Sequence, residues 1–233
     1  MSKLIIYLGI ISVLISCKKE EEENPSPDTE TTVPSVFDIV GNYEMSSGPH
    51  DLAVKNDFVF ACRDDKIYVV NTADTTSPAL TATIDDLEAS NDFECLLVEG
   101  NTLYAGCTSS AGVYMYDISN PSSPVALGKY IDDIYPGTKL NTMSLHFAGG
   151  SLWASGSNGT SGALVKFNVQ NNSLSLVEYW ASSGSGDAAE GVWANSSHVY
   201  TSTANGHVLA FDQANITTGP IGDYTFQAET GPS

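Results

Sequence analysis

Basic residues are scarce in this chain. It has 9 Lys and Arg against 28 Asp and Glu among 233 residues, which gives a formal net charge of −19 at pH 7. A protein that holds nucleic acid or an anionic membrane surface by charge needs clustered Lys and Arg to neutralise phosphate groups. The composition therefore excludes nucleic acid as a partner of that kind and leaves cations and basic ligands as candidates.

Cysteine is also rare, with 4 residues in the whole chain. One of them, Cys17, belongs to an N-terminal signal described below. The other three, Cys62, Cys95 and Cys107, cannot all pair within the chain. A bridge from Cys95 to Cys107 is conceivable across a hairpin, but a cross-strand disulfide needs particular geometry. We therefore predict three buried free thiols.

Long apolar runs are missing except at the N-terminus, where Leu4–Ile15 is too short to span a bilayer as a permanent helix. Lys3 precedes this run, and Leu14-Ile15-Ser16-Cys17 fits a bacterial lipobox. We expect residues 1–16 to be a lipoprotein signal peptide and Cys17 to be acylated, so that several acyl chains anchor the protein in a lipid bilayer. An ordinary secretory signal or a short buried helix is the alternative.

Residues 17–36 have too little apolar content to fold. Lys18-Lys19 is followed by four Glu residues and then by a run rich in Pro and Thr, which predicts a disordered tether. The basic-then-acidic run behind Cys17 resembles the export signal of Bacteroidota surface lipoproteins. That resemblance implies an outer-membrane lipoprotein facing outward on the cell surface. A plain spacer in a periplasmic lipoprotein is the alternative.

One pattern occurs four times: an apolar strand ending in Asp or Asn, a polar turn, and a second apolar strand. The strand before the polar turn ends in Asn71, Asp117, Asn168 and Asp212, in steps of 46, 51 and 44 residues. This period is that of a four-stranded propeller blade and is too long for a leucine-rich repeat. Each repeat divides into four short strands between Gly, Asn, Asp, Ser and Pro turns. We predict an all-β chain whose residues 37–233 form a β-propeller, with blades at about 46–84, 89–131, 140–180 and 188–226.

Several strands are apolar without strict alternation, such as Tyr68-Val69-Val70 and Tyr114-Met115-Tyr116. This pattern predicts burial on both faces of the sheet, which stacked blades provide. A β-sandwich would bury one face of each strand and is the alternative fold.

The outer strands do not match the inner ones in number. Residues 41–45 (Gly-Asn-Tyr-Glu-Met) resemble residues 222–226 (Gly-Asp-Tyr-Thr-Phe), which close the fourth repeat. The sequence therefore contains five candidate outer strands but only four sets of the three strands that precede an outer strand in a blade. We interpret the chain as the first part of a longer propeller; a closed four-bladed ring with a redundant edge strand is the alternative.

The second repeat, from Tyr114-Met115-Tyr116-Asp117 through Asn120-Pro121-Ser122-Ser123-Pro124-Val125, resembles the LVIVD-repeat family of propeller proteins, and Tyr68–Pro78 is a looser copy. The third and fourth repeats lack the Pro pair. The resemblance covers about Gly41 to Phe226 and implies a propeller, often on secreted or surface-anchored bacterial proteins. It implies no shared reaction and no catalytic residues.

The acidic residues are expected to gather on one side of the propeller. In an antiparallel blade, the loop between the second and third strands and the crossover to the next blade emerge at the same side. These loops contain Asp64, Asp65, Asp85, Asp86, Asp132 and Asp133. Aligning the inner strands places His50, Glu94, Met143 and Glu190 at equivalent positions beside the central channel. We hypothesise a metal site there, with His50, Glu94 and Glu190 as ligands and Ca²⁺ as the favoured ion, or a basic-ligand site at the acidic face. Solvated loop charges are the alternative.

Two functional classes remain. The first is a surface-exposed or periplasmic lipoprotein whose propeller is a binding scaffold for an extracellular protein, a glycan or a cation. The second is a propeller hydrolase or lyase that uses a metal in the central channel. The sequence has no Ser nucleophile in a strand-to-helix turn and lacks several His ligands at one site. It therefore favours binding, and Trp153, Trp180 and Trp193 are interpreted as fillers between blades, with stacking of an exposed one on a glycan ring as the alternative.

Overall fold

The computed structural model describes residues 41–45, 47–85, 92–108, 112–134, 139–159, 161–184 and 187–225. The chain divides into two compact units, Met1–Asp38 and Ile39–Ser233, and the described residues all belong to the second. The predicted signal peptide, the predicted lipidation site Cys17, the whole of the predicted tether and Asp86 lie outside the described residues.

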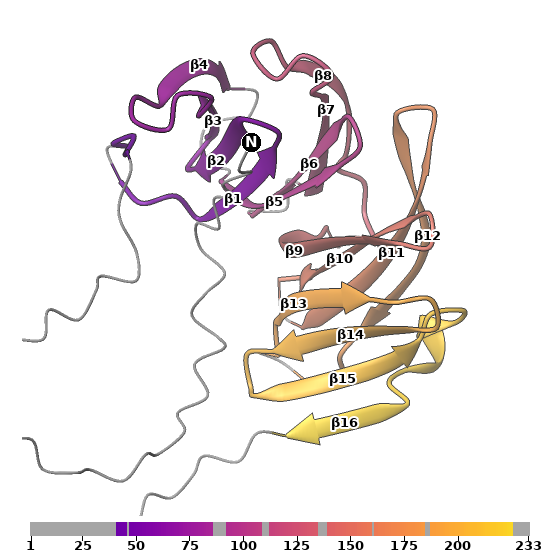
Figure 1. The fold of residues 1–233 in the computed structure, drawn as a ribbon. Helices are drawn as coiled ribbons and strands as arrows, with labels where there is room; N and C mark the ends of the chain where they lie inside the picture. The colour runs from indigo at the N-terminus through magenta and orange to yellow at the C-terminus, as the bar shows by residue number, and fades with distance from the viewer. Residues whose placement is uncertain are drawn as a thin grey trace, which may run out of the picture. The chain divides into compact units, whose positions relative to one another are not determined.

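The described residues form four antiparallel sheets of four strands each (Figure 1). The first sheet contains β1 (Asp51–Lys55), β2 (Phe58–Arg63), β3 (Lys66–Asn71) and β4 (Ala79–Ile84). The second contains β5 (Phe93–Glu99), β6 (Thr102–Cys107), β7 (Gly112–Asp117) and β8 (Val125–Tyr130). The third contains β9 (Asn141–Ala148), β10 (Ser151–Ser157), β11 (Gly162–Gln170) and β12 (Ser173–Ala181). The fourth contains β13 (Ala189–Ala194), β14 (His198–Thr203), β15 (His207–Asp212) and β16 (Gly222–Thr225), with the 3₁₀ turn η1 (Ile216–Thr218) before β16.

Within each sheet the strands pair in chain order, so every sheet is a simple meander. Two-residue turns join several strands. Asn171-Asn172 joins β11 to β12 with φ of 49° and 59°, and Asn56 and Asp64, each with φ of 51°, begin the turns after β1 and β2. Asn and Asp tolerate the left-handed region better than other residues with a side chain, and it is the region that tight hairpin turns require. In the part of the chain that the structure describes, no helix is long and apolar enough to cross a bilayer.

Consecutive sheets pack through their first strands: β1 lies beside β5, β5 beside β9, and β9 beside β13. Three apolar clusters fill the spaces between the sheets, one for each consecutive pair. The inner sheets are therefore buried on both faces, as Tyr114, Met115 and Tyr116 show with exposed fractions of 7%, 1% and 1%. This arrangement confirms the β-propeller prediction over the sandwich, in which a sheet buries one face only.

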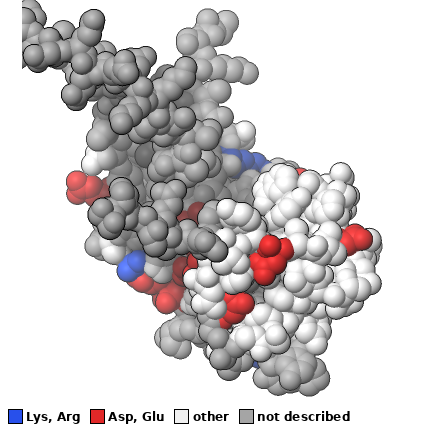
Figure 2. Space-filling view, turned by 90° about the horizontal axis from the view of Figure 1, so that it is seen from below, with Lys and Arg blue, Asp and Glu red and all other residues white. Residues whose placement is uncertain are grey.

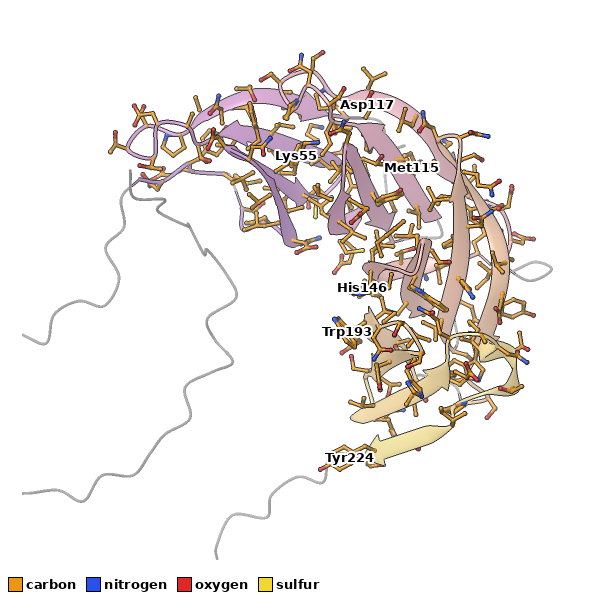
Figure 3. The ribbon with its side chains drawn as sticks, turned by 45° about the vertical axis from the view of Figure 1, so that its right-hand side comes forward. Lys55, Met115, Asp117, His146, Trp193 and Tyr224 are labelled. Atoms are coloured by element: carbon orange, nitrogen blue, oxygen red, sulfur yellow. The ribbon has the colours of Figure 1, made fainter. Side chains whose placement is uncertain are left out.

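The first and fourth sheets are the two ends of the row (Figure 3). Each inner sheet is packed on both sides, but none of the described strands of the first sheet packs closely against a strand of the fourth. The interface that would close a ring of four sheets is thus not formed between the described residues.

The three described cysteines are free and buried, as predicted. Cys107 pairs with Phe93 across the β5–β6 hairpin and Cys95 with Gly106, so the two thiols are not opposite each other. Burial raises the pKa of the Cys62 thiol to about 12. The same cause raises the pKa of Cys95 and Cys107. These side chains act as small apolar groups in the packing between sheets.

Candidate functional site

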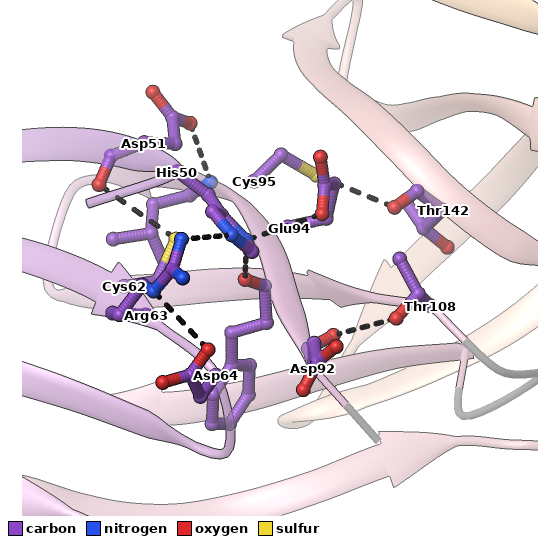
Figure 4. A network of polar contacts seen from close by, with 12 residues as sticks. His50, Asp51, Cys62, Arg63, Asp64, Asp92, Glu94, Cys95, Thr108 and Thr142 are labelled. Carbon is purple, nitrogen blue, oxygen red and sulfur yellow. Dashed lines mark hydrogen bonds and ion pairs between the residues drawn. The ribbon is translucent and has the colours of Figure 1, made fainter. Parts of the chain in front are cut away.

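A polar cluster joins the first sheet to the second at the start of β1 and is centred on His50 (Figure 4). The Nδ1 atom of His50 lies 3.2 Å from the carbonyl oxygen of Phe93 and 3.3 Å from Oε2 of Glu94. Its Nε2 atom lies 2.7 Å from Nη1 of Arg63. A carbonyl and a carboxylate only accept hydrogen bonds and a guanidinium only donates them. In this arrangement Nδ1 is the donor to Phe93 and Glu94, and Nε2 accepts from Arg63.

Further contacts in this cluster connect the two sheets. Nε of Arg63 lies 3.1 Å from Oδ1 of Asp64. Asp51, on β1, accepts a 2.7 Å hydrogen bond at Oδ2 from the backbone N–H of Leu96 on β5. A carboxylate acceptor makes a stronger hydrogen bond than a neutral one. Asp51 therefore satisfies the backbone N–H of Leu96 on the neighbouring sheet and helps to fix the position of the first sheet relative to the second.

The structure brings together two of the three residues predicted as metal ligands, His50 and Glu94. Glu190 lies on β13 in the fourth sheet, and Met143 lies on β9. Among the described residues, no group of three or more His, Cys, Asp or Glu is placed to hold a metal ion. Arg63 also occupies the imidazole nitrogen that a metal would need. The Ca²⁺ site stays a prediction, and the geometry at His50 does not add to its support.

The loops that were expected to carry acids do meet on one side of the first two sheets. Nζ of Lys66 lies 3.2 Å from Oδ1 of Asp65, in the β2–β3 loop, and 3.2 Å from Oδ2 of Asp85, after β4. The backbone N–H of Phe93 donates to the carbonyl oxygen of Asp64 at 2.8 Å. Hydrogen bonds to Asp65 and then to Asp85 raise the pKa of Lys66. The loop and the crossover are therefore neighbours, as the topology requires.

The same side of the second sheet carries Asp132 and Asp133, in the crossover that follows β8. Both residues are exposed. Burial, and then the negative charges of Asp132 and Asp133, raise the pKa of Tyr130. Tyr130 is the last residue of β8, so the two carboxylates lie near the end of that strand. We call Asp64, Asp65, Asp85, Asp132 and Asp133 the acidic edge. Figure 2, which views the molecule from below, shows acidic side chains at several places on the described surface.

A second feature, which the sequence reasoning missed, is an aromatic pair on the fourth sheet, of which Trp193 is exposed and Tyr200 is half-buried. Trp193, on β13, is 53% exposed. Its ring centroid lies 5.9 Å from that of Tyr200 on β14 and 5.7 Å from that of His146 on β9. The filler interpretation is right for Trp153, which is fully buried, but wrong for Trp193. The residues around each Trp do not predict this difference in exposure, because it depends on whether another sheet packs against the face that carries the Trp.

Comparisons with known proteins support the fold. No family model matches the chain, and no curated protein matches it. Among solved structures, a protein from Lactobacillus plantarum matches with a TM-score of 0.64 and 11% identity over 78% of this chain and 57% of its own. A candidate 6-phosphogluconolactonase from Bacteroides fragilis matches with a TM-score of 0.61 and 16% identity over 78% and 58%. BamB from Moraxella catarrhalis matches with a TM-score of 0.55 and 15% identity over 76% and 49%.

The chain thus spans between 49% and 58% of the length of these three structures. Identities this low show a shared architecture and no shared activity. Together with the four packed sheets, they define the described part of the chain as a set of β-propeller blades.

Proposed function

We propose that this chain is a lipid-anchored β-propeller that acts as a binding scaffold on the outer side of the cell, and that its acidic edge is the contact surface for a basic protein or peptide. The proposal joins three parts: the acylation of Cys17, the acidic tether that places the propeller away from the bilayer, and the propeller itself. The resemblance to the LVIVD-repeat family and to Bacteroidota surface lipoproteins belongs to the same proposal.

The observation that carries the binding role is the exposure of the carboxylates on the acidic edge. The side chains of Asp64 and Asp85 are 61% and 55% exposed. Arg63 and Lys66, which lie on this edge, are each already paired with a carboxylate. Added to a net charge of −19, this geometry produces a negative potential that attracts cationic partners and orients them during encounter.

Binding of an octalysine peptide at low ionic strength tests the role of this edge. The double variant Asp132→Asn with Asp133→Asn removes two charges from the acidic edge. The double variant Asp57→Asn with Glu99→Gln removes two charges at the opposite ends of the sheets, since Asp57 lies in the turn after β1 and Glu99 is the last residue of β5. Both variants change the net charge equally, so the comparison separates a local surface from the total charge.

We expect the acidic-edge variant to bind the peptide about 2- to 30-fold more weakly, because two exposed ion pairs of about 0.2–1 kcal/mol each are lost. The control variant should bind nearly as tightly as the unmodified chain. Added salt should weaken all binding, since the interaction is between exposed charges. Equal losses in the two variants would show that only net charge matters and would contradict a dedicated contact surface.

A further inference from the structure

Each sheet has two different faces, and the second strands show the difference most clearly. Successive side chains of a strand point to opposite faces. The third residue of each second strand is a large aromatic; these are Phe60, Tyr104, Trp153 and Tyr200. In the first three sheets it points toward the next sheet along the chain. The fourth residue is small and lies on the other face of its sheet; these are Ala61, Ala105, Ala154 and Thr201. In the last three sheets this face is turned toward the preceding sheet. We call these the forward face and the backward face.

Three interfaces inside the chain join a forward face to a backward face. Phe60 shares an apolar cluster with Ala105 of the next sheet, and Tyr104 shares one with Ala154. Trp153 lies in the cluster that contains Val199, beside Thr201 on β14. The three aromatic side chains are 0%, 3% and 0% exposed. The next sheet therefore covers the ring almost completely at each of the three interfaces.

The fourth sheet presents the same forward face with no described sheet in front of it. Trp193, Tyr200 and Ala210 stand side by side across β13, β14 and β15. Next to them, Val208 pairs with Tyr224 on β16, which is 62% exposed. In Figure 3, Trp193 lies close to His146 along the inner strands. The forward face of the fourth sheet thus carries the same kind of aromatic side chain that the first three sheets bury against their neighbours.

The first sheet presents the matching backward face. Val54, Val59, Val70 and Leu80 form one row across its four strands. Val54 and Leu80 are 59% and 42% exposed, and Leu52 beside them is 40% exposed. In the second sheet Leu96 takes the place of Leu52, because each pairs with the Ala at the fourth position of the second strand. Leu96 is 7% exposed beneath the first sheet. The first and fourth strands of this face therefore expose apolar side chains to solvent, while Val70 between them is 5% exposed.

We propose that the forward face of the fourth sheet docks on the backward face of the first sheet of a second copy of this chain. The two faces are the two halves of an interface that the chain already makes three times, which argues for this occupant. Two copies related by a two-fold axis would use the contact twice and close a ring of eight sheets. A head-to-tail contact that closes gives a finite ring, and eight blades lie within the range of known propellers.

Cross-linking tests the predicted neighbours. Within the chain, Cys62 on the first sheet and Leu96 on the second lie in one apolar cluster. The equivalent residues of the proposed contact are Ser202 of one copy and Leu52 of the other. The full chain with Ser202→Cys and Leu52→Cys is treated with bismaleimidoethane, and the unmodified chain and both single variants serve as controls. The described native cysteines are buried, so the reagent should react with the introduced thiols and not with Cys62, Cys95 or Cys107.

The proposed ring predicts a covalent dimer for the double variant and no larger product. A ladder of trimers and longer species would indicate an open filament and would overturn the ring. A product confined to the monomer would overturn the contact itself. None of the controls should give the dimer, and a dimer in any of them would also count against this contact.

The oligomeric state of a surface variant provides an independent test. Sedimentation equilibrium of the full chain in detergent should give twice the mass of one chain. Trp193→Glu should give a monomer with at least a 10-fold weaker association, while its melting temperature stays near that of the unmodified chain because the side chain is half exposed. Val177→Glu is the matched control, since Val177 is 51% exposed on the outer strand β12. A monomeric unmodified chain, or an equal loss in both variants, would overturn the proposal.

Discussion

The aromatic residue in the middle of each second strand is the most consequential single position in a repeat. Phe60 is fully buried between the first and second sheets, where it packs with Leu103 and Ala105. We expect Phe60→Ala to lower the free energy of unfolding by about 3–5 kcal/mol, because the change removes buried apolar surface and leaves a cavity. Urea unfolding followed by tryptophan fluorescence measures this loss. Val125→Ala, at a position that is 58% exposed, should change it by less than about 0.5 kcal/mol.

The buried thiols give the stability a defined dependence on pH. Burial raises the pKa of Cys62 from its ordinary value of 9.0 to about 12. The folded state therefore keeps its proton at a pH where the unfolded state releases it. The contribution of this thiol is complete below pH 9.0 and is lost as the pH rises toward about 12.

Unfolding free energies measured between pH 8 and pH 11 check this dependence. Each such thiol should add a slope of about −1.4 kcal/mol per pH unit above its unfolded pKa. Cys62→Ala should remove one such slope while the other groups continue to titrate. A variant whose stability falls as steeply as that of the unmodified chain would show that Cys62 is not the source.

At the scale of the strand and turn, local sequence is sufficient to predict most of the architecture. Polar turn residues between apolar runs place the strands, and the period of the repeats predicts four sheets. Bulges are different: β10 changes register on β9 between Ser155 and Gly156, and β11 changes register on β12 between Lys166 and Phe167. A bulge depends on how two strands fit each other, so one strand's sequence does not reveal it.

The turn between β11 and β12 allows a test at this scale. Asn171 and Asn172 both adopt positive φ, at 49° and 59°. Asn172→Val should lower the free energy of unfolding by about 1–2 kcal/mol, since a β-branched residue is disfavoured in the left-handed region. Asn172→Gly should be neutral or slightly stabilising because Gly adopts that region without strain. Thermal unfolding compares the two, and a similar cost for both would point to lost side-chain contacts instead.

At the scale of the whole molecule, the sequence predicts the partners of charged side chains and the exposure of individual residues less well than it predicts the positions of the strands. Alignment of the inner strands correctly brought Glu94 beside His50, but it gave no indication that Arg63 would hold the second imidazole nitrogen. The exposure of Trp193 was equally hidden, because the repeat pattern is the same in every sheet. Both outcomes depend on contacts between sheets, which lie far apart in the sequence.

The lipid anchor is the remaining prediction at this scale, and it rests on Leu14-Ile15-Ser16-Cys17. Cells that express the chain should incorporate labelled palmitate into it, and Cys17→Ser should abolish the label, because the thiol is the acceptor of the diacylglycerol group. Ser16→Ala is the control, since a small residue is retained before the cysteine. An unlabelled chain, or a label that survives Cys17→Ser, would contradict lipidation at this residue.

Proteinase K added to intact cells then separates the two possible locations of the anchored propeller. Residues 17–36 are rich in Glu, Pro and Thr, and such a solvated tether should hold the sheets away from the bilayer and within reach of the protease. Loss of the chain from intact cells, with a periplasmic control protein left whole, would place the propeller on the cell surface. Protection until the outer membrane is permeabilised would instead place it in the periplasm. Replacing Lys18, Lys19 and the following four Glu residues by Ser and Gly should convert the first outcome into the second if this run is the export signal.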